Sequence, residues 1–182
     1  MNALSTPQPR CLASLQADAL SSHRFHVKHR YSDGMVRLLI TGMSGVGKSS
    51  VLCELGERGY PVIDTDYGPW KTETGLWDDV LMGALLGEST EVVVSGTVAN
   101  QGDFYDRFDH VVLLSAPLSV LLDRVSMRTT NPYGSTADER EEITSNLASI
   151  EPLLRASATV EIDATQPLHH VVDRVEELLH RL

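Results

Sequence analysis

Residues 36–49 read VRLLITGMSGVGKS, and this stretch decides the fold of the chain. An apolar run breaks into a glycine-rich turn, in which Gly42, Gly47, Lys48 and Ser49 match the pattern G-x-x-x-x-G-K-[ST]. The surroundings fit the motif, because a strand-like run precedes the turn and a helix-forming stretch, SSVLCELGERG, follows it. An ordinary glycine-rich turn rarely meets this pattern by chance. The sequence therefore predicts a phosphate-binding loop between a strand and a helix.

The spacing within this loop follows from the chemistry of phosphate binding. Glycines let backbone N–H groups turn toward phosphate oxygens, and the next helix directs the positive end of its dipole at the same anion. We expect Lys48 to reach the β- and γ-phosphates of ATP and the Ser49 hydroxyl to take one position around Mg²⁺. The predicted ATP-binding residues of the loop are Gly42, Met43, Ser44, Gly45, Val46, Gly47, Lys48, Ser49 and Ser50.

The composition fits a single nucleotide-binding domain. The chain has 182 residues, which suffice for one well-buried core. Its net charge of −10 argues against general nucleic-acid binding, which needs a basic face. No apolar run reaches transmembrane length, and Cys11 and Cys53 make neither a disulfide framework nor a metal pair. We expect a cytoplasmic monomer or homodimer that binds a small molecule and neither nucleic acid nor a membrane.

Residues 1–34 differ from the rest of the chain in their charge. Their basic residues are Arg10, Arg24, Lys28 and Arg30, against the two acids Asp18 and Asp33. The simplest interpretation is a disordered or loosely attached extension, which leaves 35–182 as the domain proper. A transit peptide, which is also basic and poor in acids, and a regulatory or nucleic-acid-binding arm remain alternatives.

From residue 36 onward, the apolar pattern alternates between strands and helices. The predicted strands are 36–41, 60–63, 91–96, 110–116 and 158–163. The predicted helices are 49–58, 75–87, 101–108, 118–128, 137–157 and 167–182. The runs EVVVSG and HVVLLSA are almost continuously apolar, as in strands buried on both faces. This order predicts a doubly wound parallel sheet, with the ligand at the carboxyl ends of the strands.

Asp64 and Asp66 form a carboxylate pair directly after the second predicted strand. At this sheet edge, one carboxylate can hold Mg²⁺ through water while the other orients or deprotonates an acceptor hydroxyl. A simple turn is the competing interpretation, because Asp is common in turns. The run EVVVSG supplies Ser95 and no acid at its end, and HVVLLSA also ends without one. We assign Asp64, with Ser49, to the metal and Asp66 to the catalytic base, although the two roles can be exchanged.

Arg124 and Arg128 share one face of a predicted helix, because they stand four residues apart. The loop TTNPYGST follows them, so both guanidinium groups can cover bound nucleotide when this loop closes. We predict that both take part in catalysis by binding phosphates or neutralising the transferring group. The competing interpretation is a solvated helix face with an ordinary salt bridge.

From residue 36 to residue 182, the chain resembles the small P-loop kinases: shikimate kinase, gluconate kinase and the adenylate-kinase-like nucleoside monophosphate kinases. The resemblance rests on GMSGVGKSS, on IDTD after the second strand and on LLDRVSMR before a short loop. It implies a P-loop NTPase fold, which is a three-layer αβα sandwich with a short lid and a five-stranded parallel sheet in the order 2-3-1-4-5. The chain also looks like actinobacterial ATP-binding, kinase-like proteins of the AAA type, in which NQGxFYDRF and RTTNPYG recur.

The same resemblance implies roles for particular residues. Arg124 would stack on the adenine of ATP, and Pro167, in the loop after the fifth strand, would lie opposite it. Arg128 would reach the phosphates. Asp64 and Asp66 would match the acidic pair of shikimate kinases.

Departures from the shikimate kinase pattern bear on the substrate. Those enzymes grip a carboxylate with arginines, yet Lys71 is the only lysine or arginine between Arg58 and Arg107. The segment IEPLLRASA resembles their R-x-P-L-Y stretch, but Ile150 replaces the arginine and Leu154 replaces the tyrosine. Shikimate itself is therefore disfavoured, and a phosphate acceptor would lack its usual arginine clamp.

The region after the second strand instead combines acids with aromatic residues. The acids are Asp64, Asp66, Glu73, Asp78 and Asp79, and the aromatic residues are Tyr67, Trp70 and Trp77. This combination suits a neutral, hydroxyl-rich or cationic acceptor, unless the tryptophans only cover the sheet.

The sequence predicts an ATP-dependent kinase that transfers the γ-phosphoryl group to a small hydroxyl or phosphate acceptor. The alternative is a nucleotide-dependent switch or accessory protein without such an acceptor. A GTPase switch fits less well, because the chain has no N-K-x-D guanine signature.

Overall fold

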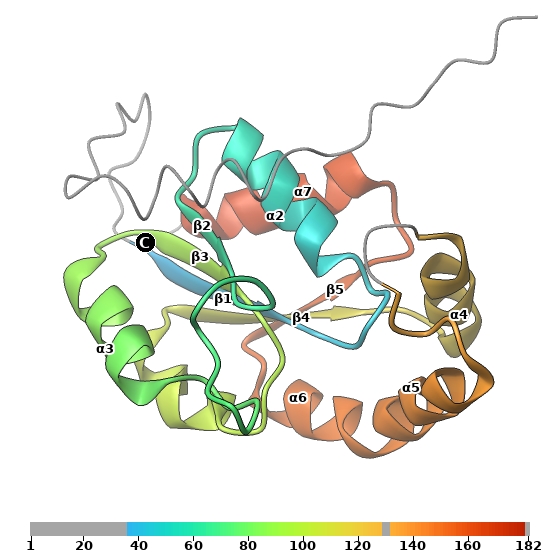
Figure 1. Ribbon diagram of the computed structural model, residues 1–182. Helices are drawn as coiled ribbons and strands as arrows, with labels where there is room; N and C mark the ends of the chain where they lie inside the picture. The colour runs from blue at the N-terminus through green and yellow to red at the C-terminus, as the bar shows by residue number, and fades with distance from the viewer. Residues whose placement is uncertain (1–35, 129–131, 181–182) are drawn as a thin grey trace, which may run out of the picture.

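The computed structural model describes residues 36–128 and 132–180. Its strands form one parallel sheet in the order β2-β3-β1-β4-β5, which confirms the expected fold (Figure 1). The strands are β1 (Arg37–Thr41), β2 (Val62–Asp64), β3 (Val92–Ser95), β4 (His110–Ser115) and β5 (Val160–Asp163). The expected extension 1–34 and the first residue of the expected domain, Met35, lie outside the described residues.

Helices cover both faces of the sheet and give the molecule three layers. The helices are α2 (Lys48–Glu57), α3 (Asp79–Glu88), the 3₁₀ helix η1 (Gln101–Arg107), α4 (Leu118–Met127), α5 (Ala137–Ser149), α6 (Glu151–Ser157) and α7 (Leu168–Leu179). In Figure 1, α2 and α7 lie above the sheet, while α3, α5 and α6 lie below it. None of the helices in the described part is long and apolar enough to cross a membrane.

Each strand of the sheet centre buries side chains on both faces. In β1, Leu38 and Ile40 join the core that α2 and α7 cover, whereas Leu39 joins the core beneath α3 and η1. These side chains are fully buried, and those of β4 are buried from Val111 to Leu114. This burial explains why the strands read as continuous apolar runs rather than as an alternation.

The helix that was expected at 75–87 begins later, at Asp79. Asp78 caps it, because its carboxylate accepts hydrogen bonds from the backbone N–H groups of Val80 and Leu81, both at 2.9 Å. Before this cap, Gly75 adopts a positive φ of 79° in a turn, so the chain cannot be helical there.

The long helix that was expected at 137–157 is interrupted at Ile150. Helix α5 ends at Ser149, and α6 starts at Glu151 with Pro152 in its first turn. Proline has no N–H group and its ring clashes with the carbonyl four residues earlier, so a continuous helix is disfavoured here. The interruption lies at one wall of the pocket described below.

Candidate active site

The phosphate loop lies between β1 and α2 and packs closely against the neighbouring elements. Gly42 has a φ of +143°, and a Cβ atom there would lie 2.4 Å from the carbonyl oxygen of Leu114 at the end of β4. Gly45 has a φ of +86°, and its Cβ atom would lie 2.8 Å from the carbonyl oxygen of Leu121 in α4. Only glycine fits these two positions, so the pattern that was identified in the sequence reflects real steric limits.

Lys48 is the first residue of α2 and folds back over the loop. Its Nζ donates hydrogen bonds to the carbonyl oxygens of Gly42, at 2.7 Å, and Met43, at 3.4 Å. Desolvation lowers the pKa of the Lys48 ammonium, and the nearby carboxylates of Asp66 and Asp64 partly oppose this shift. The loop thus holds a cation at the place where the motif requires one for the terminal phosphates of ATP.

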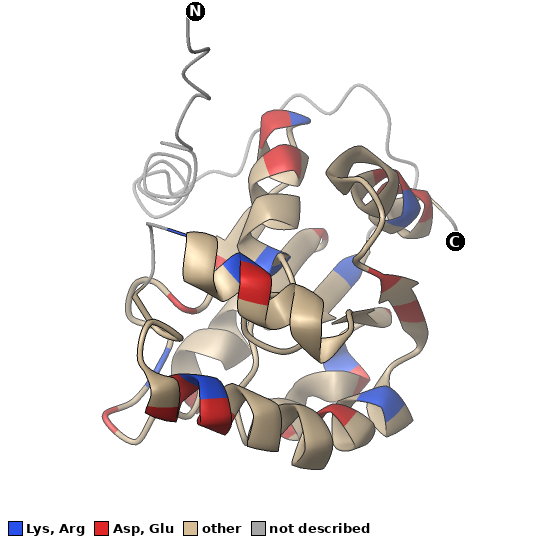
Figure 2. Cartoon of the chain, turned by 90° about the vertical axis from the view of Figure 1, so that its right-hand side faces the viewer, with Lys and Arg blue, Asp and Glu red and all other residues tan. Residues whose placement is uncertain are grey.

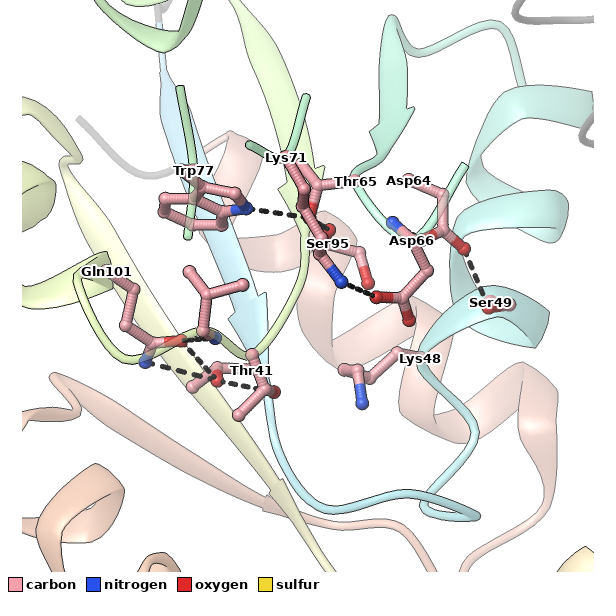
Figure 3. Close-up of polar contacts among 12 residues, drawn as sticks. Thr41, Lys48, Ser49, Asp64, Thr65, Asp66, Lys71, Trp77, Ser95 and Gln101 are labelled. Carbon is pink, nitrogen blue, oxygen red and sulfur yellow. Dashed lines mark hydrogen bonds and ion pairs between the residues drawn. The ribbon is translucent and has the colours of Figure 1, made fainter. Parts of the chain in front are cut away.

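Ser49 and Asp64 are brought together at the neighbouring edge of the sheet. The Ser49 hydroxyl donates to Oδ2 of Asp64 at 2.7 Å, while Oδ1 of Asp64 accepts from the backbone N–H of Asp66 at 3.1 Å (Figure 3). Asp64 is fully buried, and this burial raises the pKa of its carboxyl group, with the hydrogen bond from Ser49 opposing the shift.

The donor set of this pair fits Mg²⁺. A hydroxyl and a carboxylate are oxygen ligands, and Mg²⁺ usually takes one or two protein ligands and completes its shell with water and substrate phosphates. The described residues contain no group of three His, Cys, Asp or Glu side chains that could hold a metal by themselves. Any Mg²⁺ here would therefore depend on the nucleotide for further ligands.

Asp66 points away from this pair and toward the open side of the site. Its Oδ1 accepts a hydrogen bond from Nζ of Lys71 at 2.6 Å, and about two fifths of its side chain is exposed (Figure 3). Lys71, the only lysine or arginine between Arg58 and Arg107, is thus paired with Asp66. The two carboxylates therefore differ in their surroundings. Asp64 is buried beside Ser49, whereas Asp66 lines the pocket and forms an ion pair with Lys71.

Arg124 connects the phosphate loop to the loop after β5. Its guanidinium donates to the carbonyl oxygen of Val46 at 3.0 Å and to that of Ala164 at 2.7 Å. Pro167, in the same loop as Ala164, stands immediately before α7. Arg124 and this loop thus border one side of the phosphate loop, where the resemblance implies the adenine.

Arg128 reaches the phosphate loop from the end of α4. Its Nη2 donates to Oγ of Ser44 at 3.3 Å and to the carbonyl oxygen of Tyr133 at 2.5 Å. Its Nε is buried and has no hydrogen-bond partner among the described residues. Desolvation lowers the pKa of this guanidinium, and neighbouring groups, Tyr67 first among them, oppose the shift. Neither Arg128 nor Arg124 forms a salt bridge within the described ranges. Residues 129–131 of the expected lid lie outside those ranges.

A pocket of about 360 Å³ opens beside the phosphate loop. The loop residues and Lys48 line one side of it, and Asp66 and residues 97–99 line the next. Tyr133 and the facing side chains of α5 and α6 complete the wall. Among the described residues, Lys48 and Asp66 are the only charged ones in this lining.

Gln101 and Thr97 support this pocket, and sequence reasoning missed both. Thr97 donates to the carbonyl oxygen of Gly42 at 2.9 Å, and its hydroxyl lies 3.1 Å from that of Thr41. Gln101 is buried, and its Oε1 accepts from the N–H of Val98 at 3.2 Å and from the Thr41 hydroxyl at 3.3 Å. Gln101 belongs to the quoted NQGxFYDRF stretch, which was the only signal in the sequence that could have indicated it.

The two tryptophans belong to the core and do not line the pocket. Trp77 is 1% exposed, and its indole N–H donates to the hydroxyl of Thr65 at 2.9 Å. The side chain of Asn100 holds the backbone of Trp77, accepting from its N–H at 2.9 Å and donating to its carbonyl oxygen at 3.1 Å. Trp70 is 7% exposed. Of the two readings that the sequence left open for the tryptophans, their burial supports the one in which they cover the sheet.

Acidic and basic residues are interspersed over the elements that Figure 2 shows. One ion pair among the described residues joins Arg155 of α6 with Glu161 of β5 at 2.9 Å.

The sequence of this chain is similar to a known domain family and to a known kinase. The AAA domain family matches residues 38–145 of the chain. A shikimate kinase of Halorhodospira halophila (strain DSM 244 / SL1) is 31% identical over 150 residues, which cover 71% of this chain and 84% of that protein.

Solved structures share the fold over most of their length. Shikimate kinase from Acinetobacter baumannii, in complex with shikimate, is 22% identical with a TM-score of 0.61, covering 80% of this chain and 91% of that chain. A gluconokinase from Sinorhizobium meliloti 1021 is 24% identical with a TM-score of 0.53, with the same coverage of 80% and 91%.

Proposed function

Because this chain belongs to the AAA domain family and to the small P-loop kinases, and is an ATP-dependent kinase of a small molecule or nucleotide, we propose that its acceptor is a small molecule that offers a hydroxyl group. The observation that carries this proposal is the lining of the pocket beside the phosphate loop. The charged members of this lining, within the part of the chain that the structure describes, are Lys48, which serves the phosphates, and Asp66, which can serve the hydroxyl.

The transfer exchanges one P–O bond for another. The acceptor hydroxyl oxygen attacks the γ-phosphorus of ATP, the bond from this phosphorus to the β–γ bridging oxygen breaks, and ADP leaves with that electron pair. Asp66 accepts the proton of the hydroxyl, and Lys71 keeps the Asp66 carboxylate in place through its 2.6 Å contact. Positioning of the two substrates supplies most of the remaining rate enhancement.

Four further side chains serve the nucleotide in this proposal. Ser49 and Asp64 would hold Mg²⁺, which would neutralise phosphate charge when bound. Arg128 supports the phosphates, because its buried Nε lacks a partner among the described residues and a phosphate oxygen would supply one. Arg124 borders the adenine, together with the loop that contains Pro167.

The pocket favours a hydroxyl acceptor over a nucleoside monophosphate. A phosphate acceptor would need a cationic clamp, and beyond Lys48 no lysine or arginine of the described chain lines the pocket. Lys71 is engaged by Asp66, and Arg107 donates to the carbonyl oxygen of Gly83 at 3.0 Å. We also propose that the protein works in the cytoplasm, where ATP is abundant, as a monomer or homodimer.

A metabolite-pool assay tests this function. Purified protein is incubated with ATP and Mg²⁺, with and without a pool of small metabolites, and the conversion of ATP to ADP is measured. We expect conversion to rise clearly only when the pool is present. Tight ATP binding without any stimulation by the pool would instead favour the nucleotide-dependent switch.

A further inference from the structure

We propose that the acceptor is an uncharged molecule with an apolar face, which packs against the α5–α6 wall while the Asn146 amide binds one of its polar groups. This inference rests on the proposed kinase function and adds the chemical class of the acceptor. It depends on three features of the pocket: its apolar wall, its charges and one amide.

The apolar wall comes from the C-terminal half of the chain. Ile143 and Asn146 stand on α5, Leu154 stands on α6, and Ile150 lies at the interruption between the two helices. Ile143 and Leu154 are 2% and 6% exposed, so they anchor the wall in the core, while Ile150, at 36%, presents its side chain to the pocket. An acceptor with a hydrocarbon face would remove the exposed part of Ile150 from water, whereas a polyol would lose hydrogen bonds to water there.

The described residues of the pocket leave no partner for an ionised acceptor. Lys48 is the only cation among the described lining residues and is needed by the ATP phosphates. Asp66 is the only anion among them, and Lys71 already compensates its charge at 2.6 Å. A carboxylate or an ammonium group on the acceptor would therefore be desolvated against Ile143, Ile150 or Leu154 without a counterion, which is strongly unfavourable.

Asn146 provides the polar recognition. Its side-chain amide lines the pocket and makes no hydrogen bond with any other described residue, so it keeps donor and acceptor capacity for a ligand. Thr97, another polar residue of the lining, already donates to the carbonyl oxygen of Gly42. A neutral amide suits a neutral hydroxyl, carbonyl or amide group on the acceptor, which the phosphoryl transfer itself does not consume.

Fractionation of the metabolite pool by charge tests the inference. The pool is separated by ion exchange at neutral pH into anionic, cationic and neutral fractions, and the neutral fraction is divided further on a reversed-phase column. Transfer of ³²P from γ-labelled ATP is then measured with each fraction. We expect the activity in the neutral material that the reversed-phase column retains.

The other outcomes separate this inference from the kinase function. Activity in the anionic or cationic fraction, or in the unretained neutral sugars, would overturn the inference and leave the kinase function standing. The absence of transfer with every fraction and with the whole pool would contradict the kinase function and this inference together.

A matched pair of variants tests the wall directly. Ile150→Arg places a cation in the wall, and Leu153→Arg places one on the same segment at a side chain that is 64% exposed and does not line the pocket. We expect Ile150→Arg to lower kcat/KM for the retained neutral fraction by about tenfold or more, with ATP affinity and melting temperature nearly unchanged. Leu153→Arg should leave kcat/KM as it is. Equal values for both variants and the native chain would overturn the role of the wall.

Asn146→Ala tests the amide in the same assay. We expect KM for the active acceptor to rise about tenfold, as the loss of one buried hydrogen bond to a ligand typically causes. The affinity for ATP should stay unchanged, because Asn146 lies on the acceptor side. An unchanged KM would refute polar recognition by this residue.

Discussion

One unbroken stretch, residues 42–50, supplies most of the nucleotide side of the site, whereas the acceptor side is assembled from separate parts of the chain. The acceptor side takes Asp66 from the end of β2, residues 97–99 from the end of β3, and its far wall from α5 and α6. On the nucleotide side, the residues that meet the steric and electrostatic demands of phosphate are therefore adjacent in the sequence. On the acceptor side, the residues that line the pocket are distant in the sequence and are brought together by the fold. A local motif reveals the first side, and only the assembled structure reveals the second.

The strongest test of the nucleotide side is Lys48→Ala. We expect phosphoryl transfer to fall by about 10³-fold or more, because the preorganised cation at the transferring group is lost. The fold should remain nearly intact, because the hydrogen bonds of the Lys48 ammonium within the described part of the chain go only to the loop carbonyl oxygens of Gly42 and Met43. Transfer kinetics and melting temperature check both statements. Full activity of this variant would contradict the assignment of the phosphate loop.

On the acceptor side, Asp66→Asn should lower turnover by about 10²-fold, as the loss of a general base typically does. ATP affinity should be retained, because Ser49 and Asp64 are untouched. Asp106→Asn, at an exposed aspartate of η1 that does not line the pocket, is the matched control. Steady-state kinetics and equilibrium ATP binding separate the two effects. If both variants retained native turnover, Asp66 would not be the base.

Asn100→Ala should show how the acceptor side depends on the fold. Removing both hydrogen bonds to the backbone of Trp77 should reduce the free energy of unfolding by about 1–3 kcal/mol. The KM for the acceptor should rise while ATP affinity changes little, since Asn100 precedes the η1 residues that support the pocket. Denaturant unfolding and kinetics provide the measurements. A larger loss of ATP affinity than of acceptor affinity would show that the two sides are not separate.

The smallest expected effect belongs to Asp64→Asn without nucleotide or metal. Burial raises the pKa of Asp64 in the folded protein. The stability contributed by its protonated carboxyl group is therefore fully present below the unfolded pKa and is lost as pH rises through the folded value. The free energy of unfolding of the variant should therefore exceed that of the native chain by about 1 kcal/mol at neutral pH. In acid, the two should have the same free energy of unfolding. Melting temperatures in EDTA between about pH 4 and pH 8 check the sign. Lower stability of the variant at neutral pH would contradict the desolvation argument.

Much of the fold could be predicted from the sequence, because its signals are local. The phosphate loop follows from the spacing of Gly42, Gly47 and Lys48, and the strands follow from continuous apolar runs. The place where α3 begins was less clear, because the capping by Asp78 competes with an apolar pattern that extends further back. Pro152 is a local signal for the interruption at Ile150. The helix was nevertheless expected to be continuous, because the pattern of the segment is helical on both sides of this proline.

The acceptor side could be predicted only in part. The sequence indicated the carboxylates after β2 but not that Lys71 pairs with Asp66, because side-chain pairing across a loop has no fixed spacing. The support of the pocket by Gln101 joins residues 60 positions apart, Thr41 and Gln101. Such contacts depend on the register of β1 against β3, which no single segment encodes.

The interruption at Ile150 bears on how enzymes of this kind diversify. The wall is carried on two short helices, α5 and α6, which pack on each other, on α4 and on β4. Neither helix contributes to residues 42–50, so substitutions at Ile143, Asn146 or Ile150 can alter the wall while phosphate chemistry is preserved. After gene duplication, mutations in this pair of helices could therefore offer the same phosphoryl donor to a new acceptor.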